Sequence, residues 1–93
     1  MPSEIEIEYD PAKNKSNLEK HGLSLANAAD FEWETAQIEE DIRLVYSEKR
    51  FRATGWLGER LHIVIFCKRG AATRVISFRT ANEKEAKRYA NSD

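Results

Sequence analysis

The sequence contains a single cysteine, two prolines and no long apolar run. One cysteine excludes a disulfide within the chain, and the place of Cys67 in the apolar run Leu61–Cys67 predicts a buried side chain rather than a reactive thiol. No segment approaches the roughly 20 apolar residues that a membrane-spanning helix needs. The N-terminus also lacks the basic and apolar regions of a signal peptide, so we expect a cytoplasmic protein with no membrane partner.

Histidine is scarce as well, since His21 and His62 are the only two. They fall on different predicted elements, and no spacing of cysteine and histidine fits a zinc site. We therefore expect no metal and no cofactor. The 93 residues leave room for one domain, 1–93, and a hydrophobic content of 41% is typical of a folded globular chain.

The net charge of −1 conceals an unequal distribution of charge. Residues 1–46 contain four Lys or Arg and eleven Asp or Glu, a net charge of −7, whereas residues 47–93 contain eleven and five, a net charge of +6. A basic half can hold the phosphates of RNA, and an acidic half can face a basic partner. The two halves could equally neutralise each other across a dipolar surface, so charge alone does not decide between these interpretations.

Capping residues predict three helices. Asp10 can cap a helix over Pro11–His21, and the following glycine can end it. Ser24 can cap a second short helix. Thr80, with a glutamate three residues later, has the spacing of a capping box and predicts a final helix that reaches about Tyr89.

Alternating apolar residues predict five strands. The first contains Ile5 and Ile7, which alternate with glutamates; the others are expected at about Ala36–Leu44, Glu48–Leu57, Leu61–Lys68 and Thr73–Arg79. The resulting order is β-α-α-β-β-β-β-α. Short turns between the later strands predict an antiparallel sheet with two N-terminal helices on one face and a C-terminal helix, an α+β domain.

The period of two along each strand also sorts side chains between the two faces of the sheet. We expect an apolar face under the first two helices. The more open face is expected to carry five polar residues: Arg50, Arg52, His62, Ser77 and Arg79. Arg74 lies at an odd spacing from Arg79 and is expected on the opposite face, unless a bulge intervenes.

Several motifs occur in a particular order along the chain: Tyr9–Lys13, Asn17 and Lys20–Ser24, then Arg50-Phe51, Gly55 and Arg74–Ala81, and finally Glu85 and Tyr89. In this the chain resembles the BrnT family of toxins over nearly its whole length. The Lys-His-Gly corner and the Ile-Ser-x-Arg-x-Ala stretch are together quite specific. Tyr9 stands where the family commonly has Trp, and Leu25 where it has Phe, and both changes conserve bulk.

The resemblance implies a fold like that of RelE-type toxins and the activity of a metal-independent endoribonuclease that inhibits translation and growth. It also implies a partner, a BrnA-like antitoxin of the ribbon-helix-helix class, which binds the toxin in a hetero-oligomer. Operator DNA would be bound only through the antitoxin. The substrate would be RNA.

Metal-independent cleavage of RNA by its 2′-hydroxyl needs a base, cations for the phosphate oxygens and an acid for the leaving oxygen. The candidate catalytic residues are Arg79 and Arg50, whose guanidinium groups match phosphate, and His62, whose imidazole can exchange protons near neutral pH. The candidates for RNA binding are Arg52, Arg74, Lys20, His21 and Tyr89.

Each candidate also has a structural interpretation. Arg79 and Arg50 could form ion pairs with Glu85 or Glu48, and His62 could be an ordinary strand residue. Tyr89 could anchor the last helix. The alternatives to a nuclease are therefore a non-catalytic module that binds RNA or protein, and a degenerate toxin that acts only in the regulatory complex.

Overall fold

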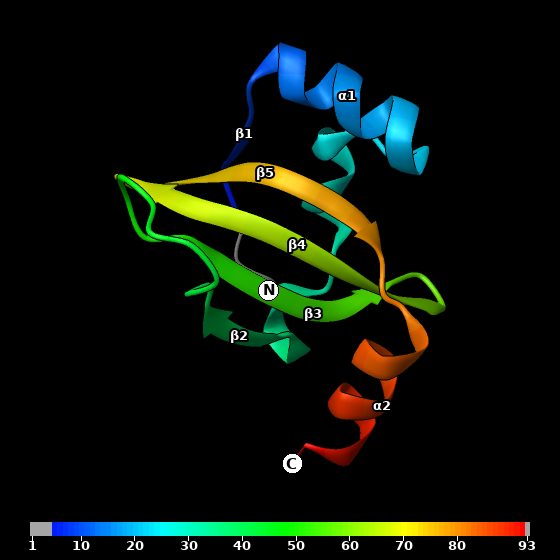
Figure 1. Cartoon of the computed structure of the whole chain (residues 1–93). Helices are drawn as coiled ribbons and strands as arrows, with labels where there is room; N and C mark the ends of the chain where they lie inside the picture. Colours follow the sequence, from blue (N-terminus) through cyan, green and yellow to red (C-terminus); the bar gives the residue numbers. More distant parts are fainter. Residues whose placement is uncertain (1–4, 93) are drawn as a thin grey trace.

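The computed structural model describes residues 5–92, in which five strands form one sheet in the order β1-β5-β4-β3-β2 (Figure 1). The strands are β1 (Ile7–Glu8), β2 (Gln37–Glu40), β3 (Phe51–Leu57), β4 (Arg60–Arg69) and β5 (Ala72–Thr80). The helices are α1 (Pro11–His21), the 3-10 helices η1 (Leu25–Asp30) and η2 (Trp33–Thr35), and α2 (Glu83–Asn91). The α+β class is confirmed. No helix within residues 5–92 is long and apolar enough to cross a membrane.

The sheet is mixed, so the prediction of a wholly antiparallel sheet was wrong. β2, β3, β4 and β5 pair antiparallel, but β1 runs parallel to β5, with Ile7 opposite Thr73. Parallel neighbours need a long connection, and every other element except α2 lies between β1 and β5 in the chain. The short turns that suggested antiparallel pairing therefore placed no constraint on β1.

The caps of α1 confirm its prediction. The Asp10 side chain accepts a hydrogen bond from the Ala12 amide, and Gly22 ends the helix with a φ of 70°. Ser24 caps the next helix as expected, but that helix is a 3-10 helix of six residues. Its first amide, that of Leu25, donates to the Asn14 side chain 2.7 Å away, which ties the short helix to α1.

The final helix begins later than the capping-box spacing at Thr80 predicted. Thr80 still belongs to β5, where it pairs with His62. The capping box is formed instead by Asn82 and Glu85, each side chain accepting from the backbone N–H of the other. The sequence therefore contained two possible capping boxes, one starting at Thr80 and one at Asn82. The pairing of Thr80 in β5 excludes the first.

β2 and β3 are shorter than predicted because residues 41–50 form an irregular connection. The carboxylate of Asp41 is 2% exposed and binds Arg43 through two hydrogen bonds of 2.8 Å, while Tyr46 donates to it at 3.2 Å. A buried carboxylate that is satisfied by residues two and five positions ahead bends the chain back on itself. The strand therefore stops at Glu40.

A bulge in β5 decides which way its side chains point. Ile65 of β4 pairs with Ser77, but the next residue, Phe66, pairs with Val75, so Ile76 is an extra residue. The alternation shifts by one position at this point. Arg74 consequently faces the same side of the sheet as Ser77 and Arg79, as expected for the case in which a bulge intervenes.

The core lies between η1 and the sheet face that it covers. It consists of Leu25, Ala28, Phe31, Ala53, Val64, Phe66, Val75 and Phe78. Gly55 is part of this face, and a Cβ atom there would lie 2.8 Å from the Phe31 ring. Cys67 is 1% exposed, which confirms that its thiol is buried.

The exposed edge of β5 is closed by one side chain of α1. The Asn17 amide donates to the Phe78 carbonyl at 2.8 Å and accepts from the Phe78 N–H at 3.1 Å. It also donates to the carbonyl of Leu23 at 2.9 Å. Asn17 is 5% exposed, so these hydrogen bonds are shielded from solvent. They take the place of the bonds that a neighbouring strand would make to Phe78.

Replacing Asn17 by alanine should therefore destabilise the fold. Loss of the amide leaves the Phe78 N–H and C=O unpaired in a buried site, which should lower the free energy of unfolding by about 2–4 kcal/mol. Urea unfolding followed by circular dichroism measures this effect. Lys15→Ala, on the exposed side of the same helix, is the control and should unfold like the wild type; equal stability of the two variants would contradict the role of Asn17.

Candidate functional site

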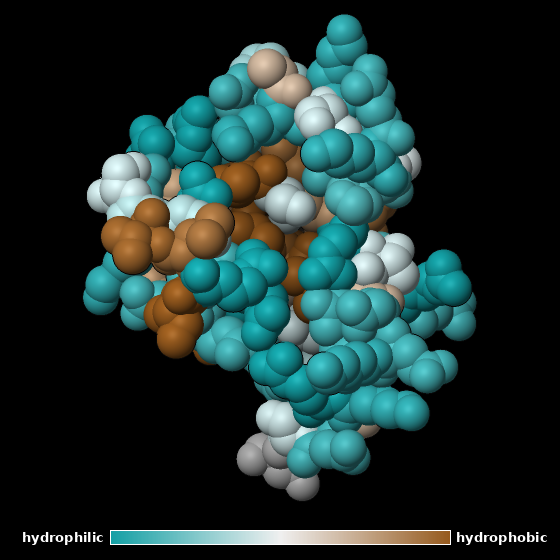
Figure 2. All heavy atoms as spheres, in the orientation of Figure 1, coloured by the Kyte–Doolittle hydropathy of each residue, from teal (hydrophilic) through white to brown (hydrophobic). Residues whose placement is uncertain are grey.

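The sheet face opposite η1 is the candidate site. Its floor is apolar and consists of Ile63, Ile65 and Cys67 from β4, all buried. The bordering strands place Arg52, Arg74, Ser77 and Arg79 on the same face. α1 lies along one edge and α2 along the other, and Figure 2 shows apolar atoms in a hollow between polar flanks.

Arg79 is held by a carboxylate of α2. Its two terminal nitrogens bind the two oxygens of Glu85 at 2.8 Å each, and the Arg79 side chain remains 29% exposed. Glu85 also accepts from the Asn82 N–H at 2.9 Å. The hydrogen bonds from Arg79, above all, lower the pKa of Glu85 to about 2, so this carboxylate is ionised at neutral pH.

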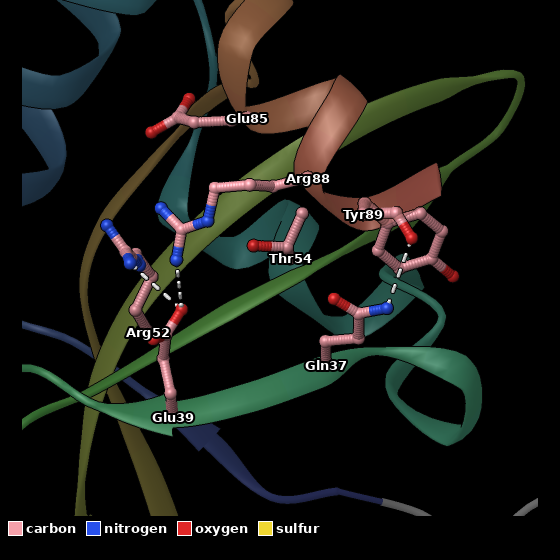
Figure 3. Close-up of a pocket in the computed structure, with 7 residues that line it drawn as sticks. All are labelled: Gln37, Glu39, Arg52, Thr54, Glu85, Arg88 and Tyr89. Carbon is pink, nitrogen blue, oxygen red and sulfur yellow. Dashed lines mark hydrogen bonds and ion pairs between the residues drawn. The ribbon is translucent and has the colours of Figure 1, made fainter. Parts of the chain in front are cut away.

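The remaining arginines of this face are also paired with carboxylates. Arg52 donates to Glu39 at 2.9 Å, and Arg88 of α2 reaches the same oxygen at 3.3 Å. Figure 3 shows both guanidinium groups directed at Glu39. Arg74 lies 3.9 Å from Glu8, a looser contact. Arg52, Arg74 and Arg79 are thus present on the open face, each within reach of an acidic neighbour.

Tyr89 anchors α2 to the sheet. Its hydroxyl donates to the Thr35 carbonyl at 3.1 Å, its ring meets Trp56 edge-on at 6.1 Å, and its backbone carbonyl accepts from Gln37. The small hollow beneath α2 is lined by Gln37, Glu39, Arg52, Thr54, Glu85, Arg88 and Tyr89 (Figure 3). Its volume of about 20 Å³ is close to that of one water molecule, so a nucleotide does not fit inside it.

A second, open hollow of about 180 Å³ lies between α1 and the edge of β5. Lys20 and His21, both exposed, line it together with Ser77 of the open face. Lys13 and Ser16 line it as well; Lys13 belongs to the Tyr9–Lys13 motif, but neither residue was predicted to be part of the site. The spacing of 13, 16 and 20 on a helix would have shown that these side chains share one face.

Two of the predicted catalytic residues lie away from Arg79. His62 is on the core face, 5% exposed, with its Nδ1 atom 2.9 Å from the Arg60 carbonyl and its ring 5.5 Å from that of Phe78. The expectation that His62 shares a face with Arg79 was therefore wrong. β4 is apolar on both faces, so its own pattern could not show which face adjoins the arginines of β3.

Arg50 precedes β3 and belongs to the irregular connection. Its guanidinium carbon lies 4.3 Å from the centre of the Tyr46 ring. Its Nε atom is buried and has no hydrogen-bond partner among residues 5–92. The predicted partner Glu48 pairs with Arg69 instead, at 3.0 Å. Arg50 thus packs within the connection between β2 and β3 and is not joined to the Arg79–Glu85 pair.

Comparisons with known proteins agree with this architecture. The family model described as "Ribonuclease toxin, BrnT, of type II toxin-antitoxin system" matches residues 9–85. The chain belongs to the BrnT family. A crystal structure of the ribonuclease toxin BrnT of Brucella abortus is similar to it, with 29% identity and a TM-score of 0.67 over 85% of this chain and 99% of that one. A comparison with curated proteins finds no match.

The family match covers the Asp10 cap, Asn17, the bulge of β5 and the Arg79–Glu85 pair. The features that form the open face are thus part of the BrnT domain and are not an addition to it. Within residues 5–92, no three His, Cys, Asp or Glu side chains are grouped so that they could hold a metal ion.

Glu85→Gln tests the ion pair through the dependence of stability on pH. Glu85 has a pKa lowered from 4.5 to about 2 in the folded chain, so its contribution is complete above pH 4.5 and is lost as the pH falls towards 2. The variant should be roughly 1–3 kcal/mol less stable at pH 7. Thermal unfolding at several pH values should show this difference shrinking below pH 4.5.

The matched control is Glu83→Gln on the same helix. Glu83 is exposed, and its contact with Lys87, at 3.8 Å, is weak. We expect the Glu83→Gln variant to unfold like the wild type at every pH. A Glu85→Gln deficit that stayed constant from pH 7 to pH 3 would contradict the ionic origin of the stabilisation.

Proposed function

We propose that this BrnT-family chain is a metal-independent endoribonuclease that cleaves RNA by attack of a 2′-hydroxyl on the adjacent phosphate, inhibits translation and growth, and is neutralised by a BrnA-like antitoxin. The observation that carries the proposal is the placement of three arginines on one open sheet face, Arg52, Arg74 and Arg79. An open face whose guanidinium groups are held by ion pairs suits an extended polyanion better than a small substrate. The mode of RNA binding would resemble that of RelE-type toxins.

Arg79 is the residue proposed to contact the scissile phosphate. Its planar guanidinium is already oriented by Glu85 on one side, and its exposed part can donate to non-bridging oxygens. Fixed donors of this kind stabilise the charge that develops on phosphate without first having to reorganise. Ser77 lies on the same face of the same strand and adds a hydroxyl donor.

The proton transfers are proposed to involve groups at the edge of this face. Glu85 has a pKa held near 2 by Arg79, which makes it a weak base and suits it to orienting that arginine. His62 lies on the opposite face. His21 lines the hollow that contains Ser77, so it is the imidazole proposed for proton transfer or for contact with the RNA backbone, with Lys20 beside it.

One observation favours the second candidate, a non-catalytic binding module or degenerate toxin. Each of the three arginines of the open face has a carboxylate within 4 Å, which would weaken their attraction for phosphate. Such a chain would still bind RNA or the antitoxin. It would produce no new RNA ends.

Induction of the wild type and Arg79→Ala in the same host separates these functions. The wild type should arrest growth and generate new RNA 5′ ends, and purified protein should cleave RNA in the presence of EDTA. Arg79→Ala should reduce cleavage by at least roughly 100-fold, the usual effect of removing one donor to a developing anion.

Arg60→Ala is the control, because Arg60 is an exposed arginine at the start of β4 and forms no ion pair among the described residues. It should cleave like the wild type. Circular dichroism establishes that both variants are folded. Wild-type protein that is soluble, free of antitoxin and without cleavage would favour the binding module.

The α1 side of the face is tested by the dependence of RNA binding on salt. Lys13→Ala with Lys20→Ala removes two cations from the hollow beside Ser77, so the slope of log affinity against log salt should become less steep by about one to two. Fluorescence anisotropy with a single-stranded RNA measures the slope. Lys84→Ala with Lys87→Ala, on the exposed side of α2, is the matched pair of changes and should leave the slope close to that of the wild type.

A further inference from the structure

The connection between β2 and β3 displays an unusual group of apolar side chains. Ile42, Leu44 and Val45 are 80%, 68% and 102% exposed, and Ile38 of β2 is 52% exposed. Figure 2 shows apolar atoms gathered on the surface where the chain of Figure 1 passes from β2 to β3. Single exposed apolar residues are ordinary, but four within eight positions form a patch that needs a covering partner.

The segment that presents this patch is held in place from inside. Asp41, almost fully buried, binds Arg43 and Tyr46. The guanidinium of Arg50 stacks on the Tyr46 ring. The hydrogen bonds from Arg43 keep the pKa of Asp41 far below its usual range, so the pair persists at neutral pH. The apolar side chains therefore project from an internally bonded support.

The adjoining strand edge has no partner among residues 5–92. β2 ends the sheet and pairs with β3 on one side only, so its outer N–H and C=O groups over Gln37–Glu40 are available to another strand. Ile38 and Glu40 point to the same side of the sheet, since they are two residues apart. An added strand would thus meet both backbone donors and acceptors and the start of the apolar patch.

The charge around β2 favours some binding partners of its free edge over others. Residues 30–41 contain six Asp or Glu and no Lys or Arg. Antiparallel pairing of β2 with β2 of a second copy would bring two acidic strands side by side, with Glu39 and Glu40 of one copy close to those of the other. Like charges on neighbouring strands oppose such pairing. A partner segment that carries basic as well as apolar side chains would instead be attracted by the acidic residues of this region.

We infer that the edge of β2 and the patch of Ile38, Ile42, Leu44 and Val45 bind the antitoxin, through an extended segment that adds to β2 and carries alternating apolar and basic residues. The inference rests on the proposed function, because a type II pair supplies the protein partner. The connection that carries the patch is also joined to the end of β4 by the Glu48–Arg69 ion pair, at 3.0 Å.

The test uses the triple variant Ile42→Ser, Leu44→Ser, Val45→Ser and the protein encoded by the reading frame next to this gene. All three side chains are exposed, so the variant should fold and should arrest growth like the wild type when expressed alone. We expect its affinity for the neighbouring protein to fall at least 100-fold and co-expression to fail to restore growth. Leu18→Ser, which removes another exposed apolar side chain from α1, should still be neutralised.

The outcomes separate this inference from the proposed function. Normal binding of the triple variant, or failure of the wild type to bind the neighbouring protein, would overturn the inference. A wild type that is not toxic would count against the nuclease, while loss of binding by the triple variant would still support the surface. Self-association of the wild type that the triple variant abolishes would assign the patch to a second copy of the chain and overturn the antitoxin.

Strand addition has its own readout. In the complex with the neighbouring protein, the amides of β2 that point away from β3 should exchange with solvent more slowly than in the free toxin. Glu40→Lys should weaken binding at least 10-fold, and this effect should shrink in high salt. Unchanged exchange of these outward-facing amides would refute the strand addition.

Discussion

The side-chain amide of Asn17 occupies the position that a neighbouring strand would otherwise take beside β5. Within residues 5–92, β1 pairs with β5 only at Thr73 and Arg74, so the later part of β5 would expose its backbone to water. By bonding both backbone groups of Phe78, Asn17 closes this edge and fixes α1 against it. The position of the Lys20–His21 corner follows from that contact, as does the firm support of the strand that carries Ser77 and Arg79.

The sequence predicted those parts of the fold that local chemistry determines. Asp10 and Gly22 delimit α1 because capping depends on neighbouring residues alone. The apolar and polar faces of β3 were also separated correctly by their alternation. The motif around Asn17 indicated the family, although nothing in its local pattern showed that its amide would reach a residue 61 positions away.

The errors concern relations between strands. A period of two assigns side chains to faces within one strand, but it does not show which face of β4 adjoins the polar face of β3, and so His62 was misplaced. The bulge at Ile76 then reversed the expected side of Arg74. Both depend on register, which packing of Phe66, Val75 and Phe78 in the core determines. Pairing of arginines with distant carboxylates such as Glu39 was likewise invisible before the sheet was assembled.

Glu85 accepts hydrogen bonds both from Arg79 and from the Asn82 N–H, and the second bond lowers the free-energy cost of releasing Arg79. In an isolated ion pair, an incoming phosphate that captures the arginine strands a desolvated carboxylate. Here the same carboxylate oxygen that meets Arg79 also accepts from the Asn82 N–H, so it would retain a hydrogen bond and its favourable position at the start of α2. The Arg79 guanidinium could therefore move from the Glu85 carboxylate to an RNA phosphate at lower cost. The carboxylate would keep its hydrogen bond from the Asn82 N–H at the start of α2.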